Sequence, residues 1–210
     1  ADTKVVNKGH GDGLYINTTG IGIVPQGVNI APNRAQAGDV VLVSGTLGDH
    51  GMAIMSVREG LAFESPILSD TTSLVPMTRA IMGACSDVHC LRDATRGGLA
   101  AVLNELASAS GVGIEFDEQA VPINLAVQSA CEMLGLDPFY VANEGKMIAI
   151  VPRADAEAVL AAMRALPNGQ HAAIIGEVVA QHPRVVIART RIGAKRVVDL
   201  PAGELLPRIC

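Results

Sequence analysis

Aromatic residues and long apolar runs are the scarcest features of this 210-residue sequence. It has no tryptophan, three phenylalanines and two tyrosines, so alanine, valine, isoleucine and leucine must fill the core. Its apolar runs are short and interrupted, far below the ~20 residues that a membrane helix needs. The start, ADTKVVNKGHGDG, is polar and predicts no signal peptide. We therefore expect a soluble protein with no membrane partner.

An excess of positive charge is also missing. The sequence has 16 lysine and arginine residues against 21 acidic residues, a formal net charge of -5. Neither a basic stripe nor an aromatic platform for bases is visible. Nucleic acid is therefore not an expected partner.

Closely spaced cysteine pairs are absent as well. The four cysteines, Cys85, Cys90, Cys131 and Cys210, form no CxxC spacing, which disfavours a disulfide framework or a zinc site and fits a reducing cytoplasm. Cys85 and Cys131 lie in apolar helical patterns, so we expect small buried core residues. Cys210 is the last residue, where chance, a disulfide to another chain and a mobile arm that carries a thiol into chemistry are the alternatives.

What the sequence does contain is an alternation of helical and strand patterns, which predicts a mixed α/β layered (α+β) domain over residues 38–190. The expected strands are 39–45, 113–116, 146–152, 172–179 and 184–190, with a QHP turn joining the last two. The expected helices are 49–60, 70–85, 94–111, 122–135 and 154–166. Pro76 marks either a kink or a late start of the second helix. Gly111 and Gly135 are expected helix stops.

Two flanking segments complete the expected organisation. Residues 1–30 alternate glycine turns with short β-like runs, and we expect strands whose partners lie partly outside this chain, which predicts a fragment. NIAPNRAQAGD, marked by proline and glycine, is the expected connector to the domain. Residues 191–210 are polar, with prolines at 201 and 207, and predict a mobile tail that carries Cys210.

Two stretches are weak candidates for phosphate chemistry. Asp2, Thr3 and Lys4 place an acceptor, a hydroxyl and a cation together, which suits magnesium or phosphate, although a solvated charge pair is the plainer alternative. SGTLGDHG at 44–51 directly follows the apolar run DVVLV, and its glycines suit an anion at a helix start. The alternative is an ordinary glycine turn with Asp49 as N-cap.

LRDATRGGLAAVLNE is the strongest local signal. Asp93 or Thr95 is expected to cap the helix, and Arg92 and Arg96 add positive charge at a helix start, where acids are normally favoured. This placement makes sense if a phosphate binds there. Gly97 and Gly98 cost roughly 1 kcal/mol each in helix propensity, which a close approach of backbone to ligand would explain. Tight packing of the helix on a strand is the alternative.

The stretch VANEGKMIAIV places Asn143, Glu144 and Lys146 in a loop before a buried strand. Glu144 is a candidate base, and Gly145 permits an unusual turn. The alternative is that Glu144 only orders its loop.

Six stretches taken together resemble one family closely. DTKVV, INTTGIG, GDVVLVSGTLGDHGMAIM, RDATRGGLAAVLNE, ANEGK and the final PRIC occur in this order. They are similar to the HypE family of hydrogenase maturation proteins, within the aminoimidazole ribonucleotide synthetase-like superfamily, and the resemblance covers essentially the whole chain. The helix start is shared more widely with selenophosphate synthetases, whereas the final PRIC is specific to HypE.

The resemblance implies an enzyme, an ATP-dependent carbamoyl dehydratase, with ATP and Mg²⁺ as cofactors. In that family the last cysteine, here Cys210, receives a carbamoyl group from the carbamoyltransferase HypF. ATP then activates the carboxamide oxygen. Its loss as phosphate, with removal of the nitrogen protons, leaves a thiocyanate on sulfur. The cyano group passes through the HypC–HypD complex to the iron of nickel–iron hydrogenase.

The resemblance also implies roles for single residues. The catalytic residues would be Cys210 as carrier, Glu144 as candidate base and Lys4 as a phosphate or proton-transfer residue. Asp2 would be a magnesium or phosphate ligand. The residues near the nucleotide or the tail channel would be Thr3, Arg92, Asp93, Thr95 and Arg96.

The family's members carry a region before DTK that adds acidic metal ligands and much of the sheet of a homodimer. On this basis residues 1–37 are expected to be a remnant of an ATP-binding and dimerisation domain plus connector. We expect the chain alone to bind ATP weakly, and its own activity stays open. Two other interpretations stay open: a selenophosphate synthetase-like small-molecule kinase, and a non-catalytic docking module that offers its tail to partners.

Overall fold

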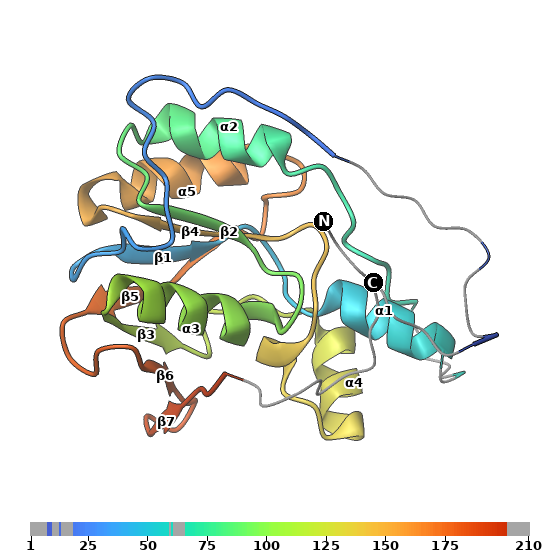
Figure 1. Ribbon diagram of the computed structural model, residues 1–210. Helices are drawn as coiled ribbons and strands as arrows, with labels where there is room; N and C mark the ends of the chain where they lie inside the picture. The colour runs from blue at the N-terminus through green and yellow to red at the C-terminus, as the bar shows by residue number, and fades with distance from the viewer. Residues whose placement is uncertain (1–7, 10–12, 14–18, 59, 61–65, 201–210) are drawn as a thin grey trace.

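A seven-stranded sheet forms the centre of the computed structural model, which describes residues 8–9, 13, 19–58, 60 and 66–200 (Figure 1). Its strands are β1 Val40–Val43, β2 Cys90–Asp93, β3 Gly113–Asp117, β4 Met147–Val151, β5 Ala173–Val179, β6 Val186–Arg189 and β7 Lys195–Val197. Their order across the sheet is β2-β4-β1-β5-β3-β6-β7. All neighbours pair antiparallel except β3 and β6, which pair parallel.

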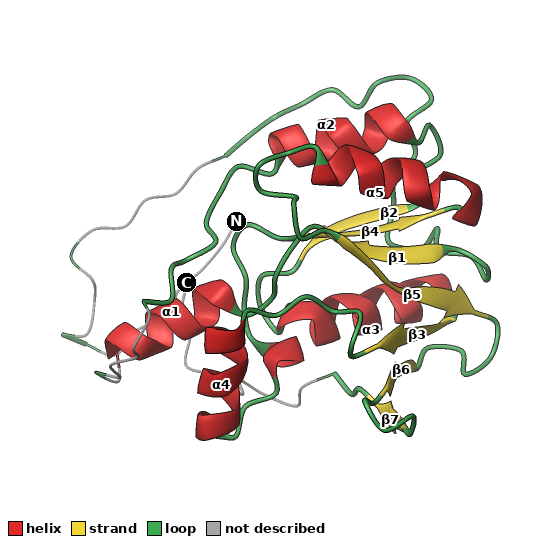
Figure 2. Cartoon of the chain, turned by 180° about the vertical axis from the view of Figure 1, so that it is seen from behind, coloured by secondary structure: helices red, strands yellow, loops and turns green. Residues whose placement is uncertain are grey.

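Helices cover both faces of this sheet (Figures 1 and 2). The α-helices are α1 Asp49–Arg58, α2 Val75–Ala84, α3 Gly98–Ser110, α4 Leu125–Leu134 and α5 Ala156–Arg164. Two 3₁₀ turns, η1 Pro138–Tyr140 and η2 Arg153–Asp155, precede β4 and α5. Helices α2 and α5 lie on one face and α3 on the other, while α1 and α4 pack together at one end of the sheet.

The period-2 alternation of the central strands divides the core into these layers. Val40 and Leu42 of β1 face α2 and α5, where they join Met77, Ile81 and Val159 in one buried cluster. Because β1 is buried on both sides, its sequence is a continuous apolar run and does not alternate with polar residues.

The opposite face of β1 packs on α3. Val41 and Val43 join Leu99, Leu103 and Leu106 of that helix in a second buried cluster. A third, smaller cluster lies between α1 and α4 and contains Met52, Met55, Val127, Cys131 and Val141.

The expected mixed α/β layers are confirmed, and most expected elements agree with the structure within a few residues. Helix α2 begins at Val75, so Pro76 marks a late start and no kink. Helices α3 and α4 stop at Gly111 and Gly135, both with left-handed backbone. Two strands were not expected: β2, whose sequence is CLRD, and β7, whose sequence is KRV.

Strands β5 and β6 are joined through the expected QHP turn but are not neighbours in the sheet, because β3 lies between them. His182 and Arg184 in this connection have positive φ, 54° and 66°. Such a connection lets the chain pass β3 and enter β6 parallel to it.

The two flanking segments differ from the expectations where they are described. Residues 19–24, where strands were expected, form no strand, and Ile21 and Ile23 are 99% and 97% exposed. The residues from 191 onward, expected to be a mobile tail, include β7. Val198 is fully buried, and its carbonyl accepts a hydrogen bond of 2.8 Å from the Asn104 side chain. Among the described residues, every helix is too short or too polar to cross a membrane.

Candidate functional site

Three chain segments meet at one edge of the sheet because β1 and β2 end there and β4 begins there. Val43 pairs with Ile148, and Asp93 pairs with Met147. The backbone pairing continues past the strands, since Ala94 N–H donates to Lys146 O at 3.1 Å. The turn 44–48, the loop 94–97 and the loop 142–146 therefore lie side by side, although they are far apart in the sequence.

Asn143 ties these three segments together. Its side chain is buried, and Oδ1 accepts from Gly48 N–H at 2.8 Å. Nδ2 donates to Ala94 O at 2.9 Å and to Val141 O at 3.1 Å. Every bond to this amide is made with backbone, so Asn143 fixes the position of the loop that carries Glu144.

Gly145 and Asp70 hold the other side of that loop. Asp70 Oδ1 accepts from the backbone N–H of Glu144 at 3.0 Å. A Cβ on Gly145 would lie 2.0 Å from Asp70 O and 2.8 Å from Thr72 Cγ2, so only glycine fits there. The requirement for glycine after Glu144 is thus one of close packing.

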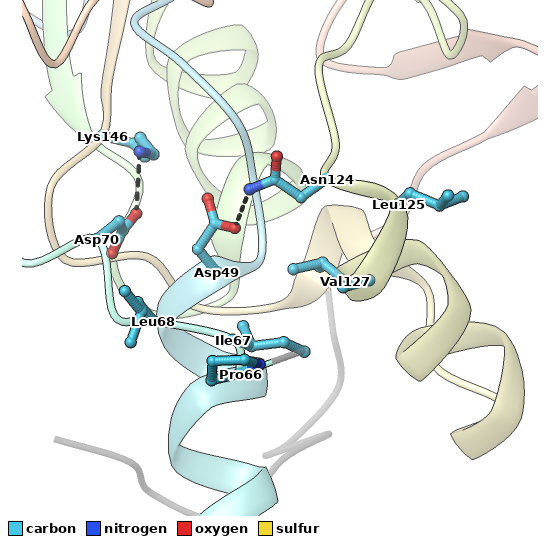
Figure 3. A pocket seen from close by; sticks show the side chains of 10 residues that line it. Asp49, Pro66, Ile67, Leu68, Asp70, Asn124, Leu125, Val127 and Lys146 are labelled. Carbon is cyan, nitrogen blue, oxygen red and sulfur yellow. Dashed lines mark hydrogen bonds and ion pairs between the residues drawn. The ribbon is translucent and has the colours of Figure 1, made fainter. Parts of the chain in front are cut away.

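A cavity of about 540 Å³ opens beside these residues (Figure 3). Its polar lining is Asp49, Asp70, Asn124 and Lys146, and its apolar lining includes Leu68 and Val127. Lys146 Nζ lies 3.6 Å from Asp70 Oδ2, and both side chains are nearly buried. The carboxylate of Asp70 thus offsets the charge of a lysine that reaches into the cavity.

The turn at 44–51 is held by side chains of its own. Asp49 is the first residue of α1, where it accepts from Thr46 Oγ1 at 2.5 Å and from Asn124 Nδ2 at 2.6 Å. Gly48 has φ 85° and lies against Val127. This favours the ordinary glycine turn, because the carboxylate that begins the helix would repel an anion there.

Glu144 faces His50 from the opposite side of the loop. The distance from His50 Nε2 to Glu144 Oε1 is 4.0 Å, and the exposed fractions of the two side chains are 10% and 27%. Among the described residues, three buried side-chain atoms have no hydrogen-bond partner: His50 Nε2, Asp70 Oδ2 and Glu144 Oε1. All three belong to this one cluster. Buried polar atoms without partners are rare and often mark a functional site.

The arginine-rich helix start is arranged differently from the expectation. The Arg92 side chain is half exposed and pairs with Asp93 at 3.0 Å and Glu105 at 3.4 Å. Thr95 Oγ1 donates to Asp93 Oδ2 at 2.5 Å. Burial raises the pKa of Asp93, but the Thr95 hydrogen bond and the Arg92 charge outweigh it and hold this pKa below its usual value. Arg96 lies in the turn between β2 and α3.

The expected N-cap by Asp93 or Thr95 is wrong, because α3 begins at Gly98 after Gly97, and Gly97 has a left-handed backbone and no side chain to cap with. Gly98 has φ 57°, and a Cβ there would lie 2.5 Å from Val141 O and 2.7 Å from Phe139 O. The chain's own backbone therefore occupies the space that a ligand would need. Close packing of the α3 start against the backbone of residues 139–141 explains why Gly98 must be glycine, so the packing alternative is favoured over an approach to a ligand.

The expected site residues Asp2, Thr3, Lys4 and Cys210 lie outside the described residues. The other three cysteines are buried and not disulfide-bonded, as expected for Cys85 and Cys131. Burial raises the pKa of the Cys85 thiol and of the Cys131 thiol to about 11 each. A thiol with so high a pKa is a poor nucleophile at neutral pH.

The described residues do not supply a metal site by themselves. No group of three or more histidine, cysteine or acidic side chains in the described part of the chain could hold a metal ion. Magnesium needs carboxylates together with substrate phosphates. Any magnesium would depend on groups beyond those described.

Sequence reasoning missed His50 and Asp70 as members of this site. His50 lies within a glycine-rich stretch that had been considered only for its backbone, and Asp70 lies in a loop with no motif. Both are far from Glu144 in the sequence, and their separations from it give no periodic signal. Local sequence patterns cannot reveal such contacts, since these residues meet only when α1 and the loop that contains Asp70 pack against the loop 142–146.

Comparisons with known proteins agree with this architecture. Residues 36–188 match the family described as AIR synthase related protein, C-terminal domain. "Carbamoyl dehydratase HypE" of Azotobacter vinelandii is 54% identical over 209 residues, and that of Escherichia coli K12 is 48% identical over 209 residues. The match covers 100% of this chain and 61% of each relative. The chain thus spans less than two thirds of the length of these relatives.

Solved structures give the same result. The crystal structure of E. coli HypE superposes with a TM-score of 0.85 at 46% identity, covering 90% of this chain and 58% of the other. A HypE in complex with ATP gives 0.81 at 44% identity, covering 86% and 55%. A HypE–HypF complex gives 0.80 at 44% identity, covering 84% and 57%.

Proposed function

Since the chain belongs to the AIR synthase related family through its C-terminal domain at 36–188, we propose that it forms part of a carbamoyl dehydratase of the HypE kind. The reaction converts a carboxamide on a cysteine sulfur into a thiocyanate, which supplies the cyanide ligands of iron in nickel–iron hydrogenase. Identity to HypE proteins along the whole chain supports this proposal. The observation that carries the chemistry is the buried, unpartnered carboxylate oxygen of Glu144.

Dehydration requires a base near the carboxamide nitrogen, and Glu144 fits this role. A catalytic base must be held rigidly and must have a free acceptor. The bonds of Asn143 and Asp70 fix the loop on both sides, and the side chain of Glu144 remains 27% exposed, so that a substrate can reach it. Glu144 therefore takes a proton from the nitrogen as the oxygen leaves.

Cys210 is the proposed carrier of the carboxamide. The reaction needs a thiolate, and the buried thiols of Cys85 and Cys131, with pKa values of about 11, do not provide one near neutral pH. Cys90 is buried as well, and burial raises the pKa of its thiol. By elimination and by the resemblance of the PRIC motif, Cys210 takes this role.

ATP is the proposed co-substrate, as the solved HypE complex with ATP supports. It supplies the phosphoryl group that makes the carboxamide oxygen a leaving group. The proposed nucleotide and metal region comprises Asp2 as Mg²⁺ ligand, Thr3, and Lys4 as phosphate or proton-transfer residue. We assign Arg92, Asp93, Thr95 and Arg96 to the same proposal, as groups near the nucleotide or the channel of the carrier segment. In the structure, Arg92 and Thr95 both bind the Asp93 side chain.

The proposed partners follow from the same reaction. HypF delivers the carbamoyl group, in line with the solved HypE–HypF complex, and the HypC–HypD complex accepts the cyano group. A homodimer in the cytoplasm is the proposed working form, with domains at 1–37 and 38–190. The proposed carrier segment is the part of 191–210 that follows β7 and Val198 and contains Cys210.

Mass spectrometry of the carrier tests this function. A protein of the relatives' full length that contains this chain is incubated with HypF, carbamoyl phosphate and ATP. We expect a carbamoyl adduct on Cys210, then loss of one water, and neither event in Cys210→Ala. Cys131→Ala is the matched control and should react like the unchanged protein. An adduct on another cysteine, with Cys210 unmodified, would contradict the proposal.

A further inference from the structure

Conversion of a carboxamide to a cyano group removes two protons from one nitrogen, but a single carboxylate holds only one. If Glu144 is the base, as the proposed function has it, the first proton must leave Glu144 before it can take the second. A base whose Oε1 is buried cannot pass that proton directly to bulk water from this side. The structure must then offer either a second base or an exit for the proton.

His50 lies where a group that accepts the proton from Glu144 would have to lie. Its side chain is 10% exposed, and the ring is fixed by a 2.9 Å hydrogen bond between Nδ1 and Ser69 Oγ. Its free Nε2 lies 4.0 Å from Glu144 Oε1. This separation is about 1 Å beyond a direct hydrogen bond, and catalytic hydrogen bonds are often long until substrate is bound.

The contacts continue from His50 to the surface. Ser69 Oγ lies 2.7 Å from Thr71 Oγ1, and Ser69 Oγ also accepts from Thr71 N–H at 3.2 Å. Ser69 and Thr71 are both exposed. Beyond the 4.0 Å step from Glu144 to His50, a series of hydrogen-bonded groups that both donate and accept protons thus leads to solvent.

The series has two consistent arrangements, one for each state of Glu144. With Glu144 ionised, Ser69 donates to His50 Nδ1, so Nε2 carries the hydrogen and faces the carboxylate. With Glu144 protonated, its hydroxyl faces a bare Nε2, while Nδ1–H donates to Ser69 and Ser69 donates to Thr71. Between the two, each hydroxyl reverses its direction and His50 changes its tautomer, from Nε2–H to Nδ1–H.

We propose that His50, Ser69 and Thr71 form a proton relay that clears Glu144 between the two proton removals of one dehydration. The carboxyl proton passes to His50 Nε2, and Nδ1 gives its proton to Ser69 Oγ. Ser69 passes its own hydroxyl proton to Thr71 Oγ1, and Thr71 passes its own to bulk water. Each relay atom gains one proton and loses one, so the net change is one proton from Glu144 to solvent.

The charges around the relay are compatible with this role. Besides His50, the charged side chain bound to Glu144 in the described part of the chain is Asp70, which accepts from the Glu144 backbone N–H at 3.0 Å and lies 3.6 Å from Lys146 Nζ. Because these two opposite charges form their own pair, the carboxylate of Glu144 is left to interact with His50.

The test is a single turnover of protein preloaded with carboxamide on Cys210, in the relatives' full length, started with ATP and followed by mass spectrometry. His50→Ala should slow the loss of water about tenfold or more, and imidazole added to the buffer should restore part of the rate. Loading by HypF and ATP affinity should not change. Ser69→Ala should slow the step by about threefold, while Ser69→Thr, which keeps the hydroxyl, should not.

Ser73→Ala is the matched control, because Ser73 is an exposed serine of the same segment whose hydroxyl accepts only a long 3.5 Å bond from Val75 N–H. A His50→Ala rate equal to that of the unchanged protein, or one that imidazole does not raise, would overturn the relay. If His50→Ala does not fold, Ser69→Ala decides, and a rate equal to that of Ser73→Ala overturns the relay. Failure of the unchanged protein to lose water would instead refute the proposed function.

Discussion

Replacing Asn143 by alanine should damage both the stability and the chemistry of the site. The change removes an acceptor from Gly48 N–H and a donor from Val141 O, whereas Ala94 O keeps its 3.1 Å bond from the Asn143 backbone N–H. Each buried group left without a partner costs about 1–3 kcal/mol. We therefore expect a loss of about 3 kcal/mol in the free energy of unfolding.

Urea denaturation of the 210-residue chain measures this loss. With a slope of about 2 kcal/mol/M, the midpoint should fall by about 1.5 M. Gln128→Ala is the matched control, because it removes another amide whose hydrogen bond, to Glu132 at 2.9 Å, is exposed. Its effect should stay within about 0.5 kcal/mol. If Asn143→Ala cost no more than this control, Asn143 would not be the residue that holds the three segments together.

Three further predictions concern the surroundings of the site. Gly145→Ala should lower the free energy of unfolding by about 1–3 kcal/mol, because its Cβ would lie 2.0 Å from a backbone oxygen. Gly83→Ala is the control: a Cβ there has nothing within 4 Å, so urea denaturation should show no loss of stability. Cys131 has a pKa of about 11, so alkylation of the native protein at pH 8 should leave it unmodified and should modify it in urea; rapid modification of the native thiol would refute its burial. Burial raises the pKa of Asp93, but the Thr95 hydrogen bond outweighs burial and holds this pKa below its usual value. The ionised Asp93 therefore stabilises the fold above about pH 4, and this contribution is lost as the pH falls through the lowered pKa. Thr95→Val should therefore be less stable than the unchanged protein at pH 7, and the difference should shrink as the pH falls through the lowered pKa of Asp93; a difference that stays constant down to full protonation of the carboxyl would contradict this.

The elements with strong local signals could be predicted from the sequence. The run VVLV is apolar on both faces, which identified β1 as a buried strand. Gly111 and Gly135 identified the ends of α3 and α4, since each takes a left-handed backbone that glycine adopts readily. Glu144 was predicted in a loop before a buried strand, and it lies there.

The elements that depend on long-range pairing could not be predicted in this way. Strand β2 has the sequence CLRD, and only its pairing with β4 makes it a strand. Strand β7 is charged, and it forms on β6 because Val198 next to it is buried. The same holds for His50, which joins Glu144 through the packing of α1 against the loop 142–146, where Gly51 N–H donates to Ala142 O at 3.0 Å. Local propensity carries no information about such contacts.

The role of Glu144 as the base is the central claim, and one measurement tests it most directly. Protein of the relatives' full length, unchanged or with Glu144→Gln, is loaded with carboxamide on Cys210, and the mass of the carrier is followed after ATP is added. The amide that this substitution introduces is nearly the same size as the carboxylate but cannot accept the proton. We predict that Glu144→Gln loads normally and then stalls, losing its water about 10²-fold more slowly or worse. Loss of that water at the unchanged rate would remove Glu144 from the mechanism.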